Sequence, residues 1–139
     1  MNPRRVVIIG GSGFIGSAIA NRLSAAGVSV LIPTRRRSRA GHVLLLPTVE
    51  VLEVDLHDPA ALVGLIAGAD AVINTVGILH SRSGSPYGPD FARAHVELPK
   101  KIVAACRNAG VRRLIHISAL GADAEGPSEY QRSKAAGEA

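Results

Sequence analysis

The stretch that decides the fold reads VVIIGGSGFIG and runs from Val6 to Gly16. Its four consecutive β-branched residues predict a buried parallel strand. Glycines follow at positions 10, 13 and 16, and a helical pattern opens directly behind them. This context separates a phosphate-binding loop from a chance run of glycines. We therefore predict a strand, a glycine turn and a helix N-terminus within one βαβ unit.

Each glycine of this loop has a physical task. Gly10 permits the tight turn, Gly13 lets a pyrophosphate approach the backbone, and Gly16 lets the helix pack closely on the strand. The free N–H groups and the dipole at the helix N-terminus then attract phosphate. We predict that these glycines, with Phe14 and Ile15, hold the pyrophosphate of NADP(H) or NAD(H). The alternative is a purely structural glycine turn.

The end of the second predicted strand indicates which dinucleotide is bound. An NAD site usually carries Asp or Glu there, about 20 residues beyond the loop, to accept hydrogen bonds from the ribose 2′-hydroxyl. This chain instead has PTRRR at positions 33–37. Guanidinium groups suit a 2′-phosphate, so we favour NADP(H), with NAD(H) as the alternative. Arg35 is the first candidate and Arg36 the second, and the competing interpretation is a solvated basic turn.

Two further pairs of residues follow predicted strands and are candidates for cofactor contacts. Asp55 and Leu56 come just past the third strand, where we expect the adenine edge. Asn74 and Gly77 lie at the end of the fourth strand, on the other side of the point where the strand order reverses. Either pair could instead cap a following turn.

The rest of the chain alternates strands with helical patterns, which predicts an α/β fold of the doubly wound, three-layer Rossmann type. Right-handed crossovers favour a parallel sheet with strand order 3-2-1-4-5. We predict strands at Val6 to Ile9, Val28 to Ile32, Val49 to Val54, Ala71 to Thr75 and Leu114 to Ile117. We predict helices at about Ser12 to Ala26, Pro59 to Ile66 and Asp90 to Asn108, and a last helix starting near Ser128.

Composition limits the class of protein. The 139 residues, 47% of them hydrophobic, suit one soluble globular domain over residues 1–139. Four of the sixteen basic residues lie between Arg35 and Arg39, so the net charge of +5 indicates a local site and no nucleic-acid partner. No stretch approaches the ~20 apolar residues of a membrane span, so we expect a cytoplasmic protein or one peripheral to a membrane. The single cysteine, Cys106, excludes an intrachain disulfide, and we expect no metal site.

The C-terminal region carries a resemblance to a known family. The stretch YQRSK at 130–134, together with the glycine loop, DL at 55–56 and NTVG at 74–77, resembles the short-chain dehydrogenase/reductase superfamily, in its extended and atypical, epimerase/dehydratase-like branch. The stretches HISALGA at 116–122 and SKAAGE at 133–138 are similar to the NADPH-binding accessory subunit of respiratory complex I and its bacterial relatives. The resemblance covers essentially the whole chain and implies an NAD(P)-binding domain, in some relatives peripheral to a membrane complex.

The resemblance also implies roles for three residues. In the family, a lysine at the position of Lys134 holds the nicotinamide ribose and lowers the pKa of a tyrosine at the position of Tyr130. The tyrosine then exchanges a proton with the substrate while hydride moves to or from the nicotinamide. Ser118 would polarise the substrate oxygen, although extended members often carry that hydroxyl one place later, at Ala119. Many relatives also have Asn where this chain has His95, which we expect to cap or pack rather than react.

These departures favour a protein that holds its cofactor mainly for structure, with weak or altered turnover. The alternative is a truncated NAD(P)-dependent oxidoreductase or sugar-nucleotide epimerase/dehydratase that uses Tyr130 and Lys134. A third class, a redox-sensing regulator, tends to lose that pair. Because the chain ends five residues after Lys134, we expect a fragment that lacks the C-terminal substrate-binding region and is inactive alone. We expect the exposed edge of the fifth strand to favour homo-oligomers.

Overall fold

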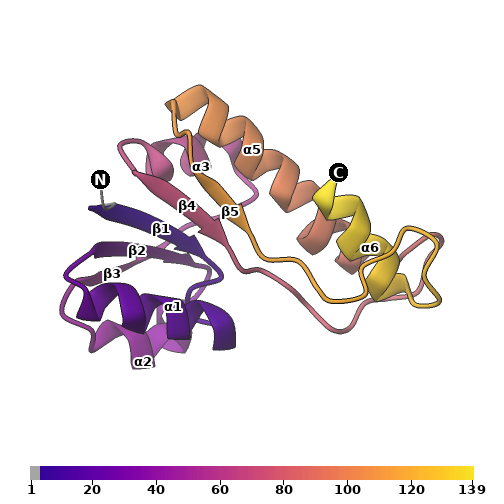
Figure 1. Cartoon of the computed structure of the whole chain (residues 1–139), viewed down its shortest axis with the longest axis horizontal. Helices are drawn as coiled ribbons and strands as arrows, with labels where there is room; N and C mark the ends of the chain where they lie inside the picture. The colour runs from indigo at the N-terminus through magenta and orange to yellow at the C-terminus, as the bar shows by residue number, and fades with distance from the viewer. Residues whose placement is uncertain (1–3) are drawn as a thin grey trace.

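Five parallel strands form one sheet in the order β3-β2-β1-β4-β5, as the sequence predicted (Figure 1). The computed structural model describes residues 4–139, without the side chains of residues 38 and 39. β1 lies at the centre of the sheet, flanked by β2 and β4, and β3 and β5 form the edges. The strands are β1 Arg5–Ile9, β2 Ser29–Thr34, β3 Val49–Glu53, β4 Ala71–Asn74 and β5 Leu114–His116.

Helices cover both faces of the sheet (Figure 1). Along β1, Val6 and Ile8 pack toward one helical layer while Val7 and Ile9 pack toward the other, which follows from the two-residue period of a strand. The first layer holds α1 Phe14–Ala25, the 3₁₀ turn η1 Arg37–Ala40 and α2 Gly41–Leu44, and the second holds α3 Pro59–Ile66 and α5 Leu98–Ala109.

The helix that follows β4 is irregular at its start. It begins with α4 Pro89–Phe91, continues through the π-helical segment η2 Ala92–Glu97 and becomes α5. Pro99 has no N–H to donate to the carbonyl of His95, four residues earlier, so the regular ladder cannot continue through this point. Irregular helical turns of this kind occur often at functional sites.

The last helix, α6 Glu129–Glu138, lies beyond the carboxyl ends of β4 and β5 and not over the sheet (Figure 1). A capping box starts it: the Ser128 hydroxyl accepts a hydrogen bond from the Gln131 N–H at 3.1 Å, and the Gln131 side chain accepts one from the Ser128 N–H. The long loops after β4 and β5 both run out to this helix.

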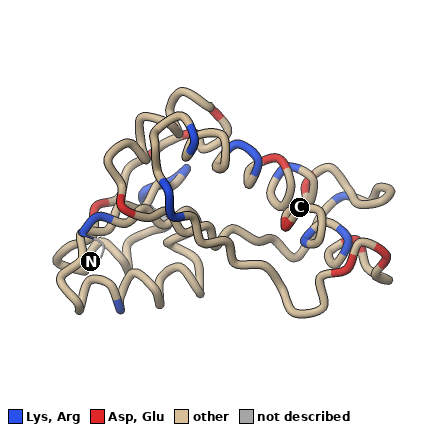
Figure 2. The backbone as a smooth tube through the Cα atoms, turned by 45° about the horizontal axis from the view of Figure 1, so that its top comes forward, with Lys and Arg blue, Asp and Glu red and all other residues tan. Residues whose placement is uncertain are grey.

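Differences from the sequence prediction are small and local. The first helix begins at Phe14 and not at Ser12, because Gly13 is extended and caps it. The short helices between residues 37 and 44 were not predicted. No helix of residues 4–139 is both long and apolar enough to cross a membrane. Basic and acidic positions are interspersed along the tube in Figure 2.

Candidate functional site

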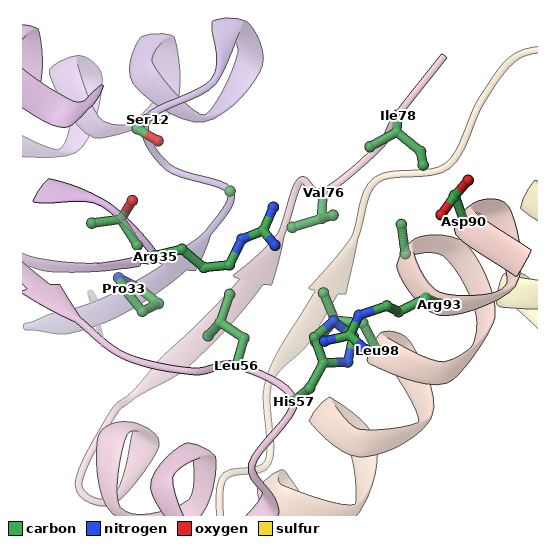
Figure 3. Close-up of a pocket in the computed structure, with 13 residues that line it drawn as sticks. Ser12, Pro33, Arg35, Leu56, His57, Val76, Ile78, Asp90, Arg93 and Leu98 are labelled. Atoms are coloured by element: carbon green, nitrogen blue, oxygen red, sulfur yellow. The ribbon is translucent and has the colours of Figure 1, made fainter. Parts of the chain in front are cut away.

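A pocket of about 340 Å³ opens at the carboxyl edge of the sheet, the edge at which doubly wound folds bind ligands (Figure 3). It forms where the strand order reverses between β1 and β4. The loops that follow β1, β3 and β4, the end of β2 and the helix at residues 90–98 all contribute to its walls.

The glycine loop adopts the geometry that its sequence requires. Gly10 lines the pocket with a φ of +83°, and a Cβ there would lie 2.6 Å from Thr75 Oγ1. A Cβ on Gly16 would lie 2.2 Å from the Gly10 carbonyl oxygen, so α1 can approach the loop only because Gly16 has no side chain. Gly13 donates its N–H to the Gly10 carbonyl at 3.0 Å. Gly10 and Gly16 therefore permit the tight packing of the loop against Thr75 and α1.

Not every residue of the predicted loop lines the pocket. Ser12 does, whereas Gly13, Phe14, Ile15 and Gly16 do not. Phe14 is 95% exposed and Ile15 is 47% exposed. Side chains this exposed at the start of α1 are available for contact with a ligand or with another part of a longer protein.

The structure separates the two candidate arginines. Arg35 lines the pocket, and in Figure 3 its guanidinium extends into it from the end of β2. Arg36 does not line the pocket, and its backbone instead pairs with the Thr34 hydroxyl. The Arg37 N–H donates to Glu53 at 2.9 Å, and the Arg39 side chain lies outside the described residues. Of the basic cluster, Arg35 is therefore the residue placed to meet a ligand.

Among the candidate residues after β3 and β4, some line the pocket and others do not. Leu56 lines the pocket, while Asp55 accepts a hydrogen bond from the His57 N–H at 3.0 Å and caps that turn. Asn74 is buried, where its side chain bonds the Val76 N–H and His116 Nδ1. Asp55 and Asn74 thus shape the loops on which Leu56 and Val76 reach the ligand.

Gly77 lies between two pocket residues, Val76 and Ile78, but does not itself line the pocket. A Cβ on Gly77 would meet only His95 Nε2, at 3.9 Å, so the backbone there is open. The space around Gly77 does not itself require a glycine.

The wall opposite Arg35 holds two residues that the sequence reasoning did not single out, His57 and Arg93 (Figure 3). Burial first, and then the charges of Arg93 and Lys101, lower the pKa of His57, so this imidazole is neutral near pH 7. Asp90 is the one carboxylate that lines the pocket among the described residues. A position directly after β3 could have pointed to His57, but Arg93 carries no signal beyond helical spacing.

Asp90 is not free to meet a ligand, because it is paired with Arg82. Two hydrogen bonds, at 2.9 and 3.1 Å, join the carboxylate to the guanidinium. These bonds and the Arg82 charge lower the pKa of Asp90 to about 2. Within residues 4–139, the pocket therefore presents the unpaired guanidinium groups of Arg35 and Arg93 and no unpaired carboxylate.

These features fit a dinucleotide with an anionic group near the end of β2. Gly10 and Ser12 offer backbone at a helix N-terminus for phosphate, and Arg35 offers a cation. Leu56, Val76 and other apolar side chains supply walls for a flat base. Among the described residues, no group of three or more His, Cys, Asp or Glu side chains could hold a metal ion.

Tyr130 and Lys134 lie on one face of α6, four residues apart. Lys134 is only 3% exposed, and its Nζ donates to the Ile117 carbonyl at 3.1 Å. Burial lowers the pKa of Lys134, with Glu138 opposing that effect. The phenol of Tyr130 makes no hydrogen bond to another described residue, so it is not hydrogen-bonded to Lys134.

Ser118 is hydrogen-bonded to α6 through a residue other than Tyr130 or Lys134. Its hydroxyl donates a short hydrogen bond to Glu138 near the C-terminal end of α6. The structure therefore places two of the three predicted catalytic residues, Tyr130 and Lys134, on one helix face, with Ser118 held by a different residue of that helix.

His95 is buried, 1% exposed, between the pocket and α6. Its Nε2 accepts a hydrogen bond from the Ile78 N–H at 3.0 Å, and its Nδ1 lies 2.8 Å from the Ser133 hydroxyl. Its ring stacks on Phe91, with centroids 5.3 Å apart, and meets Tyr130 edge-on at 5.5 Å. His95 packs, as its sequence position indicated. It also connects its own segment, η2, to the loop after β4 and to α6.

Comparisons with known proteins agree with this geometry. The family model described as "NAD dependent epimerase/dehydratase family" matches residues 6–138. Mitochondrial NADH dehydrogenase (ubiquinone) 1 alpha subcomplex subunit 9 of Mus musculus is 33% identical over 135 residues, covering 94% of this chain and 35% of its own length. A 4-hydroxy-2-methyl-3-oxo-4-farnesyl-3,4-dihydroquinoline-1-oxide ketoreductase of Stigmatella aurantiaca is 29% identical, covering 88% of this chain and 35% of its own length.

Among solved structures, MoeE5 in complex with UDP-glucose and NAD superposes with a TM-score of 0.78 at 25% identity, covering 96% of this chain and 46% of that one. The chain thus spans about a third of the length of the curated relatives it matches. The matched segment includes the glycine loop, the pocket and all of α6. The chain belongs to the NAD dependent epimerase/dehydratase family.

Proposed function

We propose that this chain is a dinucleotide-holding domain that prefers NADP(H) to NAD(H) and uses it mainly to stabilise the fold. The observation that carries the preference is Arg35, whose unpaired guanidinium enters the pocket where an NAD site would carry a carboxylate. A 2′-phosphate would satisfy this cation through charge-assisted hydrogen bonds.

A mainly structural role is supported by the state of the candidate reactive residues. Ser118 is held by Glu138, and the Tyr130 phenol lacks a polar partner among the described side chains. The relative in Mus musculus is a mitochondrial subunit of NADH dehydrogenase (ubiquinone). We extend the proposal accordingly to a cytoplasmic or membrane-peripheral domain of such an assembly.

The proposal is tested by titrating the chain with NADPH and NADH separately, following nicotinamide fluorescence and thermal stability. We expect NADPH to bind more tightly than NADH. Arg35→Glu should weaken NADPH binding by about tenfold or more, the effect of losing one charged hydrogen bond, and should leave NADH binding nearly unchanged.

Arg36→Glu is the matched control, because it makes the same charge change one residue away but outside the pocket lining. It should weaken NADPH binding less than Arg35→Glu does. Equal losses for both cofactors in Arg35→Glu would refute the 2′-phosphate role of Arg35.

The second candidate function is a true oxidoreductase or epimerase, favoured by the shared helix face of Tyr130 and Lys134 and by the buried lysine. The bound cofactor would exchange hydride with a substrate, while Tyr130 would move the proton and Lys134 would favour its phenolate. Cofactor-dependent turnover by a longer form of the protein, abolished by Tyr130→Phe, would support this candidate. Turnover that survives Tyr130→Phe would count against it.

A further inference from the structure

His95 lies at a buried hydrogen-bonded junction between the pocket and α6. On the pocket side it holds the N–H of Ile78, a lining residue. On the other side it contacts Ser133, whose hydroxyl donates to the Tyr130 carbonyl at 3.0 Å. Two hydrogen bonds through buried or half-buried groups therefore join the pocket to α6, and a third continues within the helix to Tyr130.

The helix α6 also packs against the backbone of His95. A Cβ on Gly137 would lie 2.1 Å from the His95 carbonyl oxygen, so the helix can approach only through this glycine. That carbonyl is available because Pro99 cannot donate to it. Ser133 and Gly137 are four residues apart, so one face of α6 rests on both the ring and the backbone of His95.

The imidazole must be neutral to make this junction. Nε2 accepts from Ile78, so Nδ1 carries the proton and donates to Ser133, and Ser133 can then donate onward to Tyr130. Burial, and then the charges of Lys134 and His116, lower the pKa of His95 to about 4. The junction is thus fully formed near pH 7.

Two other routes join this region to α6. One is partly buried: Lys134 donates to the Ile117 carbonyl, the Ile117 N–H donates to the Asn74 carbonyl, and the Asn74 side chain accepts from the Val76 N–H.

The other route is exposed. Gly84 donates to Glu129 and Arg132 donates to the Pro86 carbonyl, which ties α6 to the loop at 81–89. That loop reaches the pocket through the Arg82–Asp90 pair, in which Arg82 is 76% exposed. Exposed ion pairs contribute little, so this exposed path is weaker than the one through His95.

We propose that His95 is a positioning residue that couples the dinucleotide pocket to α6, so that filling the adenosine end of the pocket orders the helix that carries Tyr130 and Lys134. The inference rests on the proposed function, since the pocket must accept an adenosine bisphosphate. It assigns His95 a task that packing alone does not include, because its ring bonds both the pocket residue Ile78 and Ser133 of α6.

The probe is adenosine 2′,5′-bisphosphate, which has the phosphorylated adenosine half but no nicotinamide. Because no residue of α6 lines the pocket, any protection of α6 by this probe must travel through the protein. Hydrogen exchange at residues 129–138 is measured with and without the probe. In the unaltered chain we expect the probe to slow exchange there by about tenfold, a typical coupling between two sites.

Three variants test the path. His95→Leu removes both ring hydrogen bonds, and Ser133→Ala removes the far partner with little change in volume. Both should bind the probe with nearly unchanged affinity, yet α6 should no longer be protected. His95→Asn keeps one donor and one acceptor and should retain protection. Arg82→Met, which breaks the exposed pair, is the control and should also retain it.

Exchange at β1 and β4 in the same samples shows whether each variant is folded, and Ser133→Ala decides the question if His95→Leu does not fold. Protection of α6 that persists in Ser133→Ala, or that is lost in Arg82→Met, would overturn the inference. Probe binding without protection of α6 in the unaltered chain would overturn this inference and leave the proposed function standing. Failure of the unaltered chain to bind either the probe or NADPH would overturn the proposed function as well.

Discussion

At the scale of single residues, the glycine loop shows how steric contact fixes a residue type. Gly16→Ala would place a Cβ 2.2 Å from the Gly10 carbonyl oxygen, so the loop or α1 must shift. We expect a loss of roughly 1–3 kcal/mol in the free energy of unfolding and weaker NADPH binding. Denaturant unfolding and a cofactor titration would measure the two effects.

Gly64→Ala is the matched control for that prediction. Gly64 is also helical, but a Cβ there meets nothing within 4 Å. Alanine is the better helix former by roughly 0.5–1 kcal/mol, so this variant should be slightly more stable and bind NADPH normally. A Gly16→Ala chain as stable as the unaltered one would show that the loop relaxes freely.

The lowered pKa of His95 predicts that the free energy of unfolding depends on pH. Its pKa falls from 6.5 in the unfolded chain to about 4 in the fold, so the unfolded state binds more protons between these values. The contribution of His95 to the free energy of unfolding is fully present above about pH 6.5. It is lost as pH falls toward 4, by roughly 3 kcal/mol at most. Urea unfolding of the unaltered chain and of His95→Asn from pH 7.5 to 4.5 isolates this contribution, since His57 and His116 are common to both.

We expect the slope of stability against pH in that window to be shallower in His95→Asn. Asp90 should not contribute to the difference, because its pKa of about 2 lies below the window and both chains carry it. Identical slopes would mean that His95 remains neutral in the unfolded state or is protonated in the fold.

Sequence reasoning found some pocket residues and missed others for physical reasons. Gly10 and Arg35 could be found because a loop and a strand end fix their location. The choice between Arg35 and Arg36 depends on strand register, which spacing alone does not specify. Arg93 was missed because it lies in a π-helical segment, where side chains point in directions that regular α-helical spacing does not predict.

At the scale of elements, the alternation of strands and helices was predictable because burial on both faces makes the central strands continuous apolar runs. The short helices at 37–44 were not predictable, since a tertiary contact from Glu53 to the Arg37 N–H helps to start them. The position of α6 was also beyond prediction, because loops and the His95 junction hold it in place of a sheet face.

The capping box of α6 gives a prediction at this scale. Ser128→Ala removes the hydroxyl that accepts from the Gln131 N–H, which should cost about 1 kcal/mol and speed hydrogen exchange in the first turn. Ser83→Ala, in the exposed loop after β4, is the control and should leave exchange in α6 unchanged. Unchanged exchange in Ser128→Ala would show that tertiary contacts alone fix the start of the helix.

At the scale of the whole molecule, a bound cofactor should stabilise the fold by mass action. NADPH at a hundred times its dissociation constant adds roughly 2.7 kcal/mol to the free energy of unfolding. The thermal midpoint should rise with NADPH concentration, and Arg35→Glu should suppress most of that rise. A midpoint that does not respond to saturating NADPH would contradict the structural role.

The edge of the sheet gives a second prediction for the whole molecule. β5 pairs only with β4, and Ile115 on it is 45% exposed, so unpaired backbone and apolar surface lie together. We expect the chain to self-associate as its concentration rises, which light scattering would detect. A clean monomer at high concentration would count against this expectation.

The packing of His95 between Phe91 and Tyr130 has an optical consequence. The chain has no tryptophan and only two tyrosines, so its near-ultraviolet signal comes from very few chromophores. Tyr130 lies in an asymmetric ring cluster, 5.5 Å from His95 and 6.1 Å from Phe91. Near-ultraviolet circular dichroism of this protein therefore reports largely on whether α6 is docked.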